Sequence, residues 1–141
     1  MRVESKGFWF KSSLFAIEAG EDRETNPGRY GRHLAKWLVE KLRAFGYSVE
    51  VIPEDWGWCI MCSRHPFWLW IGCGNMDSEF PGQQKEPPRK EEVVWNCYVV
   101  GEVPFWRLSR RGDVKPAVDK LERELSSVLS SQPEIQFVEE P

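Results

Sequence analysis

Apolar residues with two different spacings divide the chain into strands and helices. The stretch GFWFKSSLFAI, from Gly7 to Ile17, is rich in aromatic and other strand-favouring residues, which predicts a first strand. Asn26 and Pro27 form a helix-start signature, because asparagine can cap free N–H groups and proline is tolerated in the first turn. Apolar residues at three- and four-residue spacing then predict a helix that Gly46 ends with a left-handed cap. The helical stripe consists of Tyr30, Leu34, Trp37, Leu38, Leu42 and Phe45.

Four more strands are predicted between this helix and the next. The second strand, Tyr47 to Ile52, alternates and ends at Pro53, and the third and fourth form a hairpin joined by the short turn SRHP. Residues 74–92 contain proline, glycine, glutamine and charges with almost nothing to bury. We therefore predict a long loop there, mobile over residues 76–92. The third, fourth and fifth strands are Trp56 to Cys62, Phe67 to Cys73 and Val93 to Val100.

The last third of the chain adds one helix and one strand. An amphipathic helix follows Asp113, a good N-cap, with Pro116 in its first turn, and residues 134–140 (EIQFVEE) predict a short final strand. The order is β-α-β-β-β-β-α-β, in a single domain that spans residues 1–141. The hairpins indicate an α+β fold, a two-layer sandwich with a largely antiparallel sheet and two helices on one face. We expect the first and second strands to lie parallel, joined by a right-handed crossover.

The middle strands are apolar on both faces, whereas a sheet covered on one face usually alternates apolar and polar residues. The second face therefore needs a cover: a loop, another copy of the chain, a partner or a ligand. Tryptophans favour interfaces and pockets, so we predict a binding surface on that face, which the solvent exposure of Trp58, Trp70 and Trp95 tests. The alternative is a strongly curved sheet that hides both faces in one core, with the long loop folded over it.

Four cysteines, Cys59, Cys62, Cys73 and Cys97, lie within apolar runs and are too few for a disulfide scaffold. Cys59 and Cys62 have the C-x-x-C spacing, and the other cysteines and His65 could complete a zinc site. On a strand, however, positions 59 and 62 point to opposite faces, and no helix start follows them to activate a redox dithiol. We therefore predict core cysteines, with zinc and redox sites as weaker alternatives, and we assign no metal site and no cofactor.

Cationic side chains crowd the predicted start of the first helix, where the helix dipole disfavours them. One explanation is internal ion pairing with acids of neighbouring loops, and the other is an anionic ligand bound by the arginines and the free N–H groups. We favour the ion pair, with Asp55 bonded to Arg29 or Arg32. The cations are Arg29, Arg32, His33 and Lys36, and the other candidate acids are Glu21, Asp22, Glu24 and Glu54.

No pattern in the sequence predicts catalysis. Neither His33 nor His65 is paired with a nucleophile, and the common phosphate-binding, dinucleotide-binding and metalloprotease motifs are absent. The net charge of -3 argues against a nucleic-acid partner. There is no run of about 18 apolar residues and no signal-peptide pattern, so we expect a cytoplasmic protein with no membrane contact. We interpret the basic cluster Arg107, Arg110 and Arg111 as a solvated connection.

Three segments carry a resemblance to a known family: NPGRYGRHLAKWLVEKLRAFGYSVEVIPEDWGW, LWIGCGN, and FWRLSRR with its following helix. Over most of its length the chain is similar to a family of small bacterial proteins with no assigned function. The motifs N-P-G-R-Y-G and P-E-D-W-G-W are the most specific, and the cysteines are not part of the pattern. The resemblance implies a bacterial protein and brings no activity, cofactor or catalytic residue.

These observations favour a cytoplasmic, non-enzymatic domain that binds a protein partner, or a second copy of itself, through a tryptophan-rich sheet face. Immunity proteins, which block a cognate toxin, are one subclass that fits. The alternative is a pocket for a small apolar or anionic molecule, with or without minor hydrolase activity. We predict no catalytic residue. The predicted binding residues are Arg29, Tyr30, Arg32, Glu54, Asp55, Trp56, Trp58, Trp70 and Trp95.

Overall fold

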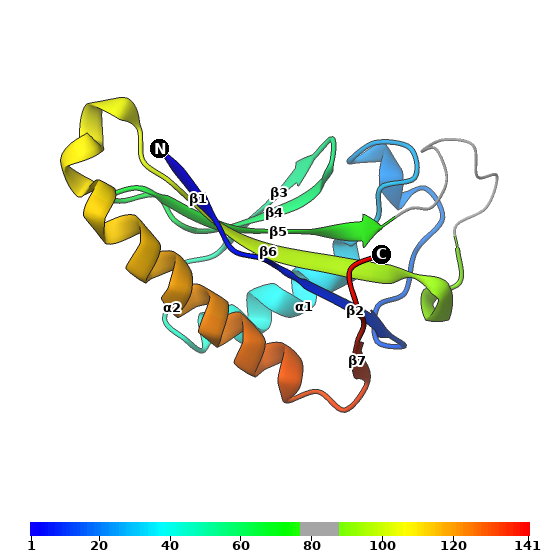
Figure 1. The fold of residues 1–141 in the computed structure, drawn as a ribbon. Coiled ribbons are helices and arrows are strands. Elements are labelled where there is room, and N and C mark those ends of the chain that lie inside the picture. The colour runs from blue at the N-terminus through cyan, green and yellow to red at the C-terminus, as the bar shows by residue number, and fades with distance from the viewer. Residues whose placement is uncertain (77–87) are drawn as a thin grey trace.

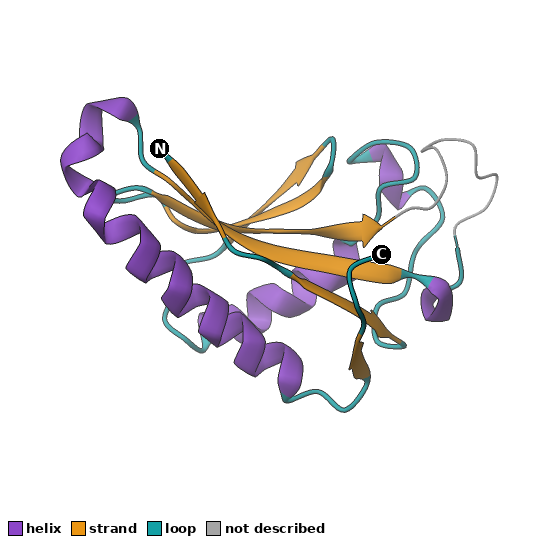
Figure 2. Ribbon diagram, viewed as in Figure 1, coloured by secondary structure: helices purple, strands orange, loops and turns teal. Residues whose placement is uncertain are grey.

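The structure is a computed structural model in which residues 1–76 and 88–141 are described. Within these ranges the chain forms a seven-stranded sheet and two α-helices, α1 (Arg32–Arg43) and α2 (Arg111–Ser130). Both helices lie on the same side of the sheet (Figures 1 and 2). Every strand pair is antiparallel, so the predicted α+β two-layer sandwich is confirmed. Neither helix is long and apolar enough to span a membrane.

The sheet has the strand order β3-β4-β5-β6-β2-β7, and β1 also pairs with β6. Its centre is the pair β5 and β6, which are nine residues long each. On the side away from β5, β6 pairs with β2 at Trp95 to Cys97 and with β1 at Val100 to Glu102. The strands are β1 (Arg2–Glu4), β2 (Phe8–Ser12), β3 (Glu50–Glu54), β4 (Gly57–Ser63), β5 (Trp68–Met76), β6 (Val94–Glu102) and β7 (Ile135–Phe137).

The amino-terminal region differs from the predicted single strand, Gly7 to Ile17. Strand β1 was not predicted, and β2 already ends at Ser12. Gly7 has φ 96, a conformation open mainly to glycine, so the chain turns there and both short strands can follow the same edge of β6. Beyond Ser12 the chain leaves the sheet, and the ring of Phe15 packs edge-on against Trp37 at 5.3 Å. The element order is therefore β-β-α-β-β-β-β-α-β.

The prediction that the first two strands lie parallel as neighbours is wrong. Strand β2 is held between β6 and β7, whereas β3 pairs with β4 at the far edge of the sheet. The long strands β5 and β6 pair along their whole length and lie between β2 and the pair of β3 and β4. The connection through α1 thus crosses most of the sheet, which local patterning along the chain does not reveal.

Helix α1 begins at Arg32, later than Asn26 and Pro27 predict. The intervening segment holds Gly28 with φ 83 and Gly31 with φ 138, and neither angle is helical. Asn26 accepts a hydrogen bond from the N–H of Arg29 (2.9 Å) in a turn instead of capping the helix. At the other end the left-handed glycine is confirmed, since Gly46 has φ 91 in the turn that ends α1.

The predicted loop 76–92 lies for the most part outside the described residues. At its ends, Met76 is the last residue of β5, and Lys90–Glu92 form a short 3-10 helix, η2. Two further 3-10 helices, η1 (Glu21–Arg23) and η3 (Phe105–Arg110), precede α1 and α2.

The main core lies between the sheet and the two helices. Helix α1 packs against β3, β4 and β5, and α2 packs against β6 and β1. Apolar side chains at alternating positions of the strands interlock with one stripe of each helix. The largest side chains that are almost fully enclosed there are Trp95, Phe10, Phe15, Leu34, Leu38, Leu42, Ile60, Ile71, Leu121, Leu125 and Leu129.

Gly101 in β6 lies directly beneath α2, and no side chain fits there. A methyl group on Gly101 would lie 2.6 Å from Val114 Cγ1 and 2.8 Å from Val118 Cγ2. Because α2 would have to move, we expect Gly101→Ala to lower the free energy of unfolding by about 2 to 3 kcal/mol in urea titrations. Gly112→Ala is the matched control, since an added methyl there meets nothing within 4 Å, and it should leave stability unchanged or raise it slightly. Equal stability of both variants would contradict this packing.

Candidate functional site

The face of the sheet opposite the helices has its own side chains and its own small apolar cluster. We call it the open face, because no α-helix of the described residues lies over it (Figure 1). Cys59, Met61, Trp70 and Val100 form a buried cluster on this face, separate from the main core, with Ile52 and Tyr98 packed beside it. The prediction that both faces of the middle sheet are apolar is therefore confirmed.

Three rings on the open face form what we call the aromatic triad: Trp56, Trp70 and Tyr98. Their centroids are 5.7 Å apart for Trp56 and Trp70, 6.2 Å for Trp56 and Tyr98, and 6.1 Å for Trp70 and Tyr98. The guanidinium of Arg2 lies 5.4 Å from the centre of the Trp70 ring, within cation–π range. Gly72 leaves room for the ring of Tyr98 in the triad, because a methyl group on Gly72 would lie 2.5 Å from that ring.

Trp56 reaches the open face because the strand alternation breaks beside it. The sequence pattern placed Trp56 and Trp58 on the same side, but β4 begins only at Gly57, whose φ is 147. A Cβ on Gly57 would lie 2.6 Å from the carbonyl oxygen of Cys73, so only glycine fits at this crossing. Trp56 therefore turns to the aromatic triad, whereas Trp58 enters the main core.

The tryptophans proposed as a binding surface are divided between the two faces. Trp58 and Trp95 point to the helices and are 4% and 1% exposed, so the expectation that they are solvent-accessible is wrong. Trp70 is on the open face, but its neighbours leave it only 8% exposed, so all three tryptophans that were to test the predicted surface are buried and that surface, as predicted from them, is wrong. Trp56 is 40% exposed and Trp68, at the start of β5 on the same face as Trp70, is 41% exposed. The sequence predicted which residues of a strand share a face, but not which of the two faces lies against the helices.

Two of the predicted polar residues border the triad. Glu54 and Asp55 are exposed in the turn between β3 and β4, next to Trp56. Arg29 lines a shallow cavity of about 220 Å³ together with Trp56 and Tyr98. Tyr30, by contrast, is only 5% exposed and belongs to the main core.

Acidic side chains also border the other end of the open face. Arg2 forms ion pairs with Glu4 (2.6 Å) and with Glu102 (2.9 Å) across β1 and β6. Two carboxylates thus share one guanidinium. With Glu54 and Asp55, the described border of the open face is acidic on balance.

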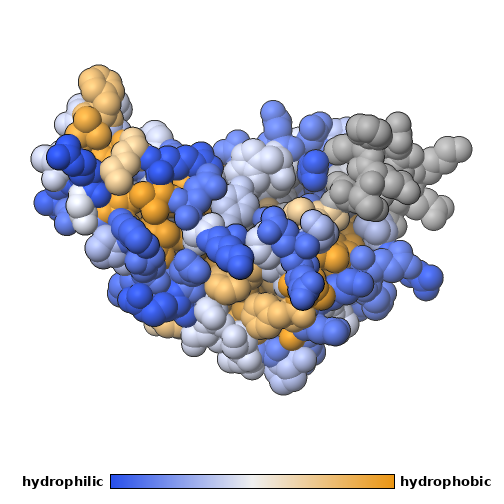
Figure 3. Space-filling model, in the orientation of Figure 1, coloured by the Kyte–Doolittle hydropathy of each residue, from blue (hydrophilic) through white to orange (hydrophobic). Residues whose placement is uncertain are grey.

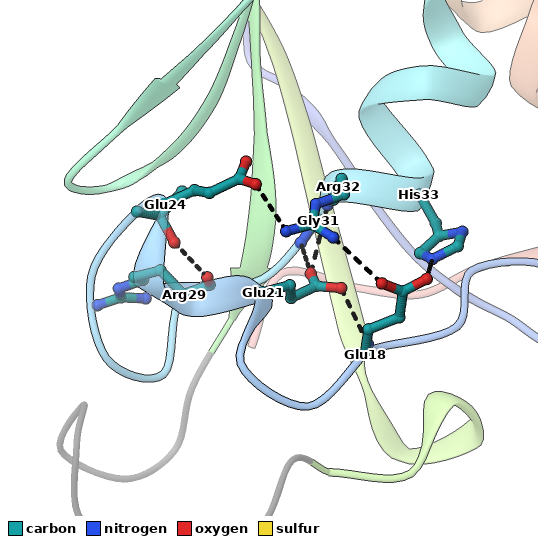
Figure 4. Close-up of polar contacts among 8 residues, drawn as sticks. Glu18, Glu21, Glu24, Arg29, Gly31, Arg32 and His33 are labelled. Carbon is teal, nitrogen blue, oxygen red and sulfur yellow. Dashed lines mark hydrogen bonds and ion pairs between the residues drawn. The ribbon is translucent and has the colours of Figure 1, made fainter.

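Residues before and at the start of α1 form a polar network (Figure 4). Glu21 is 2% exposed, and its carboxylate accepts hydrogen bonds from the backbone N–H groups of Glu18 (3.0 Å), Gly31 (3.1 Å) and Arg32 (3.4 Å). A buried anion from the chain itself therefore sits at the positive end of the helix. This is the place where the sequence analysis offered an anionic ligand as one alternative.

Two of the cations at the helix start, Arg32 and His33, are paired within the chain. Arg32 bonds to Glu18 (3.1 Å) and to Glu24 (2.8 Å), and His33 Nε2 lies 2.9 Å from Glu18. The hydrogen bond from His33 lowers the pKa of Glu18 below its usual value. Internal ion pairing is thus confirmed, but the predicted pair of Arg32 with Asp55 is wrong, because Glu18 and Glu24 lie closer along the chain.

Asn75 ties the N-P-G-R-Y-G segment to the sheet, and the sequence analysis missed it. Its Oδ1 accepts from the N–H of Tyr30 (2.9 Å), and its Nδ2 donates to the carbonyl oxygen of Gly28 (3.1 Å). The side chain is 6% exposed. A signal in the sequence could have found it. Asn75 alternates along β5 with Ile71 and Cys73, which are buried in the main core, so a polar amide there would need hydrogen-bond partners.

The four cysteines are buried and free. Cys62 lies in the main core and Cys59 in the cluster on the open face, so the prediction of opposite faces is confirmed and the two thiols cannot hold one ion together. Among the described residues no group of three or more histidine, cysteine or acidic side chains is arranged to hold a metal. Burial raises the pKa of Cys59 and of Cys62 to about 12, which leaves hardly any thiolate at neutral pH.

We expect these thiols to be unreactive in the folded protein. At pH 8 a thiol of pKa 12 is about one part in ten thousand thiolate, so a disulfide reagent such as DTNB should release almost no product within minutes. In guanidinium chloride all four should react. Rapid reaction of two thiols in the native protein would contradict core cysteines and revive the dithiol alternative.

A groove of about 680 Å³ lies between α2 and the ends of β3, β4 and β5. Its floor includes the apolar residues Val49, Cys62, Phe67 and Ala117, and its rim is polar. The cations of the rim are paired, Lys120 with Glu124 (3.4 Å) and Arg64 with Glu50 (2.7 Å). Tyr47 also lines it and donates a hydrogen bond to Glu124 (2.5 Å). Sequence reasoning did not predict this groove, because it depends on how α2 crosses the sheet.

Among the described residues, the segment η3 carries the most exposed aromatic side chains. Phe105 is 79% and Trp106 is 69% exposed, and their rings contact each other edge-on at 5.4 Å. Leu108, in the same segment, is 42% exposed. We call these three residues the aromatic projection, and hydrophobic residues stand out at this end of the molecule in Figure 3. The sequence analysis considered only the arginines of this segment, as a solvated connection, and the resemblance that the segment carries, and it missed the aromatic projection.

Comparison of the chain with protein-family models, with curated proteins and with solved structures finds no match in any of the three. The resemblance to a bacterial family with no assigned function therefore stays a prediction.

Proposed function

We propose that this chain is a non-enzymatic binding domain that contacts a protein partner through the open face. The observation that carries the proposal is an aromatic surface that neither helix of the described residues covers. Trp56 and Trp68 are 40% and 41% exposed on a face that neither helix reaches. Side chains of this kind are the usual anchors of protein interfaces, because they bury a large area with few rotatable bonds.

The border of the open face suggests the charge of the partner. Glu54 and Asp55 project from the turn beside Trp56, and Glu4 and Glu102 stand at the other end with Arg2 between them. The whole chain has a net charge of -3. A basic protein surface would be attracted by this arrangement, and salt would slow its association. An immunity-type role, in which the partner is a basic toxic enzyme, fits these charges.

The polar groups of the chain support binding better than catalysis. Cys59 and Cys62 are protonated at neutral pH, and Glu21 is fully engaged with backbone N–H groups. His33 is bonded to Glu18 on the surface. None of these groups is arranged as a nucleophile beside a base.

The test is to capture the partner from an extract of the cells that make this chain, purify it and titrate it calorimetrically. We expect a basic partner, and we expect the double variant Trp56→Ala, Trp68→Ala to bind it at least about 30-fold more weakly, as loss of a hot spot does. Phe45→Ala is the matched control, since Phe45 is 42% exposed but follows α1 on the helix side. Undiminished binding by the double variant would refute the proposal.

A second candidate, a binding site for a small molecule, is supported by the groove between α2 and the sheet. Its volume of about 680 Å³ falls within the range of ligand pockets. Its apolar floor and polar rim would suit an apolar molecule with a polar group. A thermal-shift screen of such metabolites tests it: stabilisation that Ala117→Trp removes and the open-face variants retain would favour this candidate.

A further inference from the structure

We infer that this chain forms a two-fold symmetric dimer in which the aromatic projection of each copy occupies the groove of the other. This inference does not depend on the open face. It starts from two features that the single chain leaves unexplained. Phe105 and Trp106 stand out in solvent, and an apolar groove of about 680 Å³ stays uncovered. Exposed aromatic pairs and open apolar grooves are both uncommon in chains that bind nothing.

The projection and the groove are neighbours on the molecule. Arg107 lies between Trp106 and Leu108 in sequence, and its Nη1 donates to the carbonyl oxygen of Pro66 (3.4 Å). Pro66 belongs to the lining of the groove. The exposed fraction of Phe105, 79%, shows that the projection does not fill the groove of its own chain.

This closeness favours a second copy as the occupant. A two-fold axis between projection and groove places each projection against the partner's groove, so the same contact forms twice and the assembly closes. Both copies use the same surface, which contains the projection and the groove. If the two features lay far apart on the molecule, they could not share one two-fold interface. No additional partner or ligand has to be invoked to cover either feature.

The area that such a dimer buries fits a weak association. Aromatic side chains bury about 200 Å² each, so the exposed parts of Phe105 and Trp106 supply roughly 300 Å² per copy. The groove walls that they cover lose roughly half of that area, because most of the apolar side chains that line the groove are nearly buried. Two such contacts bury on the order of 900 Å² in total, which is below the range of stable interfaces and typical of a dimer that dissociates on dilution.

A membrane surface is the competing occupant, because Arg107, Arg110 and Arg111 adjoin the projection. Of these arginines, Arg110 pairs with the carboxylate of Asp113 (3.4 Å), and the guanidinium of Arg107 is turned to the carbonyl oxygen of Pro66. Anchoring to anionic lipid needs several unopposed cations beside the apolar residues. Binding to lipid would also leave the groove uncovered.

Sedimentation of the full chain over a wide concentration range tests the inference. We expect a species of twice the 16.5 kDa chain mass that dissociates on dilution. Trp106→Asp and Ala117→Trp, which remove the projection and fill the groove, should each raise the dissociation constant at least about 30-fold. Phe45→Asp is the matched control and should leave the dimer intact, and circular dichroism checks that all variants fold.

A wild-type chain that stays monomeric at every concentration would overturn the inference. So would a dimer that survives both substitutions, because the interface would then lie elsewhere. Co-sedimentation with vesicles containing phosphatidylserine is the companion measurement. Lipid binding by a monomer, lost in Trp106→Asp, would assign the projection to a membrane surface and contradict the dimer.

Discussion

Replacing Trp95 by alanine is expected to lower the free energy of unfolding by about 4 kcal/mol, the usual cost of removing a fully buried tryptophan. Trp95 is 1% exposed near the start of β6, and Phe15 packs edge-on against it at 6.3 Å. Trp56→Ala should cost less than about 1.5 kcal/mol, because Trp56 is 40% exposed and touches only the edge of a small cluster. Denaturant unfolding followed by circular dichroism measures both values.

A conservative variant separates the ring of Trp95 from its polar atom. The indole N–H of Trp95 has no hydrogen-bond partner among the described residues. Trp95→Phe keeps most of the buried ring and removes this N–H, so we expect it to cost well under half as much as Trp95→Ala. If Trp56→Ala and Trp95→Ala destabilised the protein equally, the two faces of the sheet would be wrongly assigned.

Loss of the buried carboxylate at the start of α1 is expected to have the next largest effect. Glu21→Ala leaves three backbone N–H groups, those of Glu18, Gly31 and Arg32, without an acceptor. Hydrogen bonds to a charged group contribute about 1.5 to 3 kcal/mol each, and partial hydration of the vacated site offsets part of the loss. We therefore expect the free energy of unfolding to fall by about 3 kcal/mol, with faster hydrogen exchange at Gly31 and Arg32.

Glu24→Ala is the matched control for this prediction. Glu24 also bonds to Arg32, but its side chain is 49% exposed, and surface ion pairs contribute at most about 1 kcal/mol. Glu21→Gln should fall between the two, because the amide oxygen still accepts from the N–H groups without the charge. Equal effects of Glu21→Ala and Glu24→Ala would show that the carboxylate of Glu21 does not cap the helix.

Most of the fold was predictable because it follows from local periodicity. All six predicted strands and both helices exist, although the first strand is shorter than predicted, and the hairpin between β4 and β5 follows from its short turn. The errors come from residues whose behaviour depends on the rest of the fold. Gly7 and Gly31 adopt left-handed angles that end a strand and delay a helix, and β2 pairs with distant strands instead of β3. Such pairing is decided by tertiary contacts, which periodicity does not encode.

The candidate site was predictable only in part. An apolar second face, internal ion pairing and opposite directions of Cys59 and Cys62 all follow from alternation and charge. Alternation does not show which face of the sheet lies against the helices, because both faces of the middle strands are apolar. For this reason Trp58 and Trp95 were assigned to the wrong surface. Tyr98 joins the aromatic triad through the register of β5 and β6, which no local pattern specifies.

The most direct test of the central claim is the NMR spectrum of the tryptophan indole N–H groups, recorded with and without the purified partner. If the open face is the contact surface, the signals of Trp56, Trp68 and Trp70 shift or broaden on binding. Those of Trp58 and Trp95, buried under the helices, stay in place. Shifts confined to Trp106, or to the tryptophans of the helix side, would contradict the account.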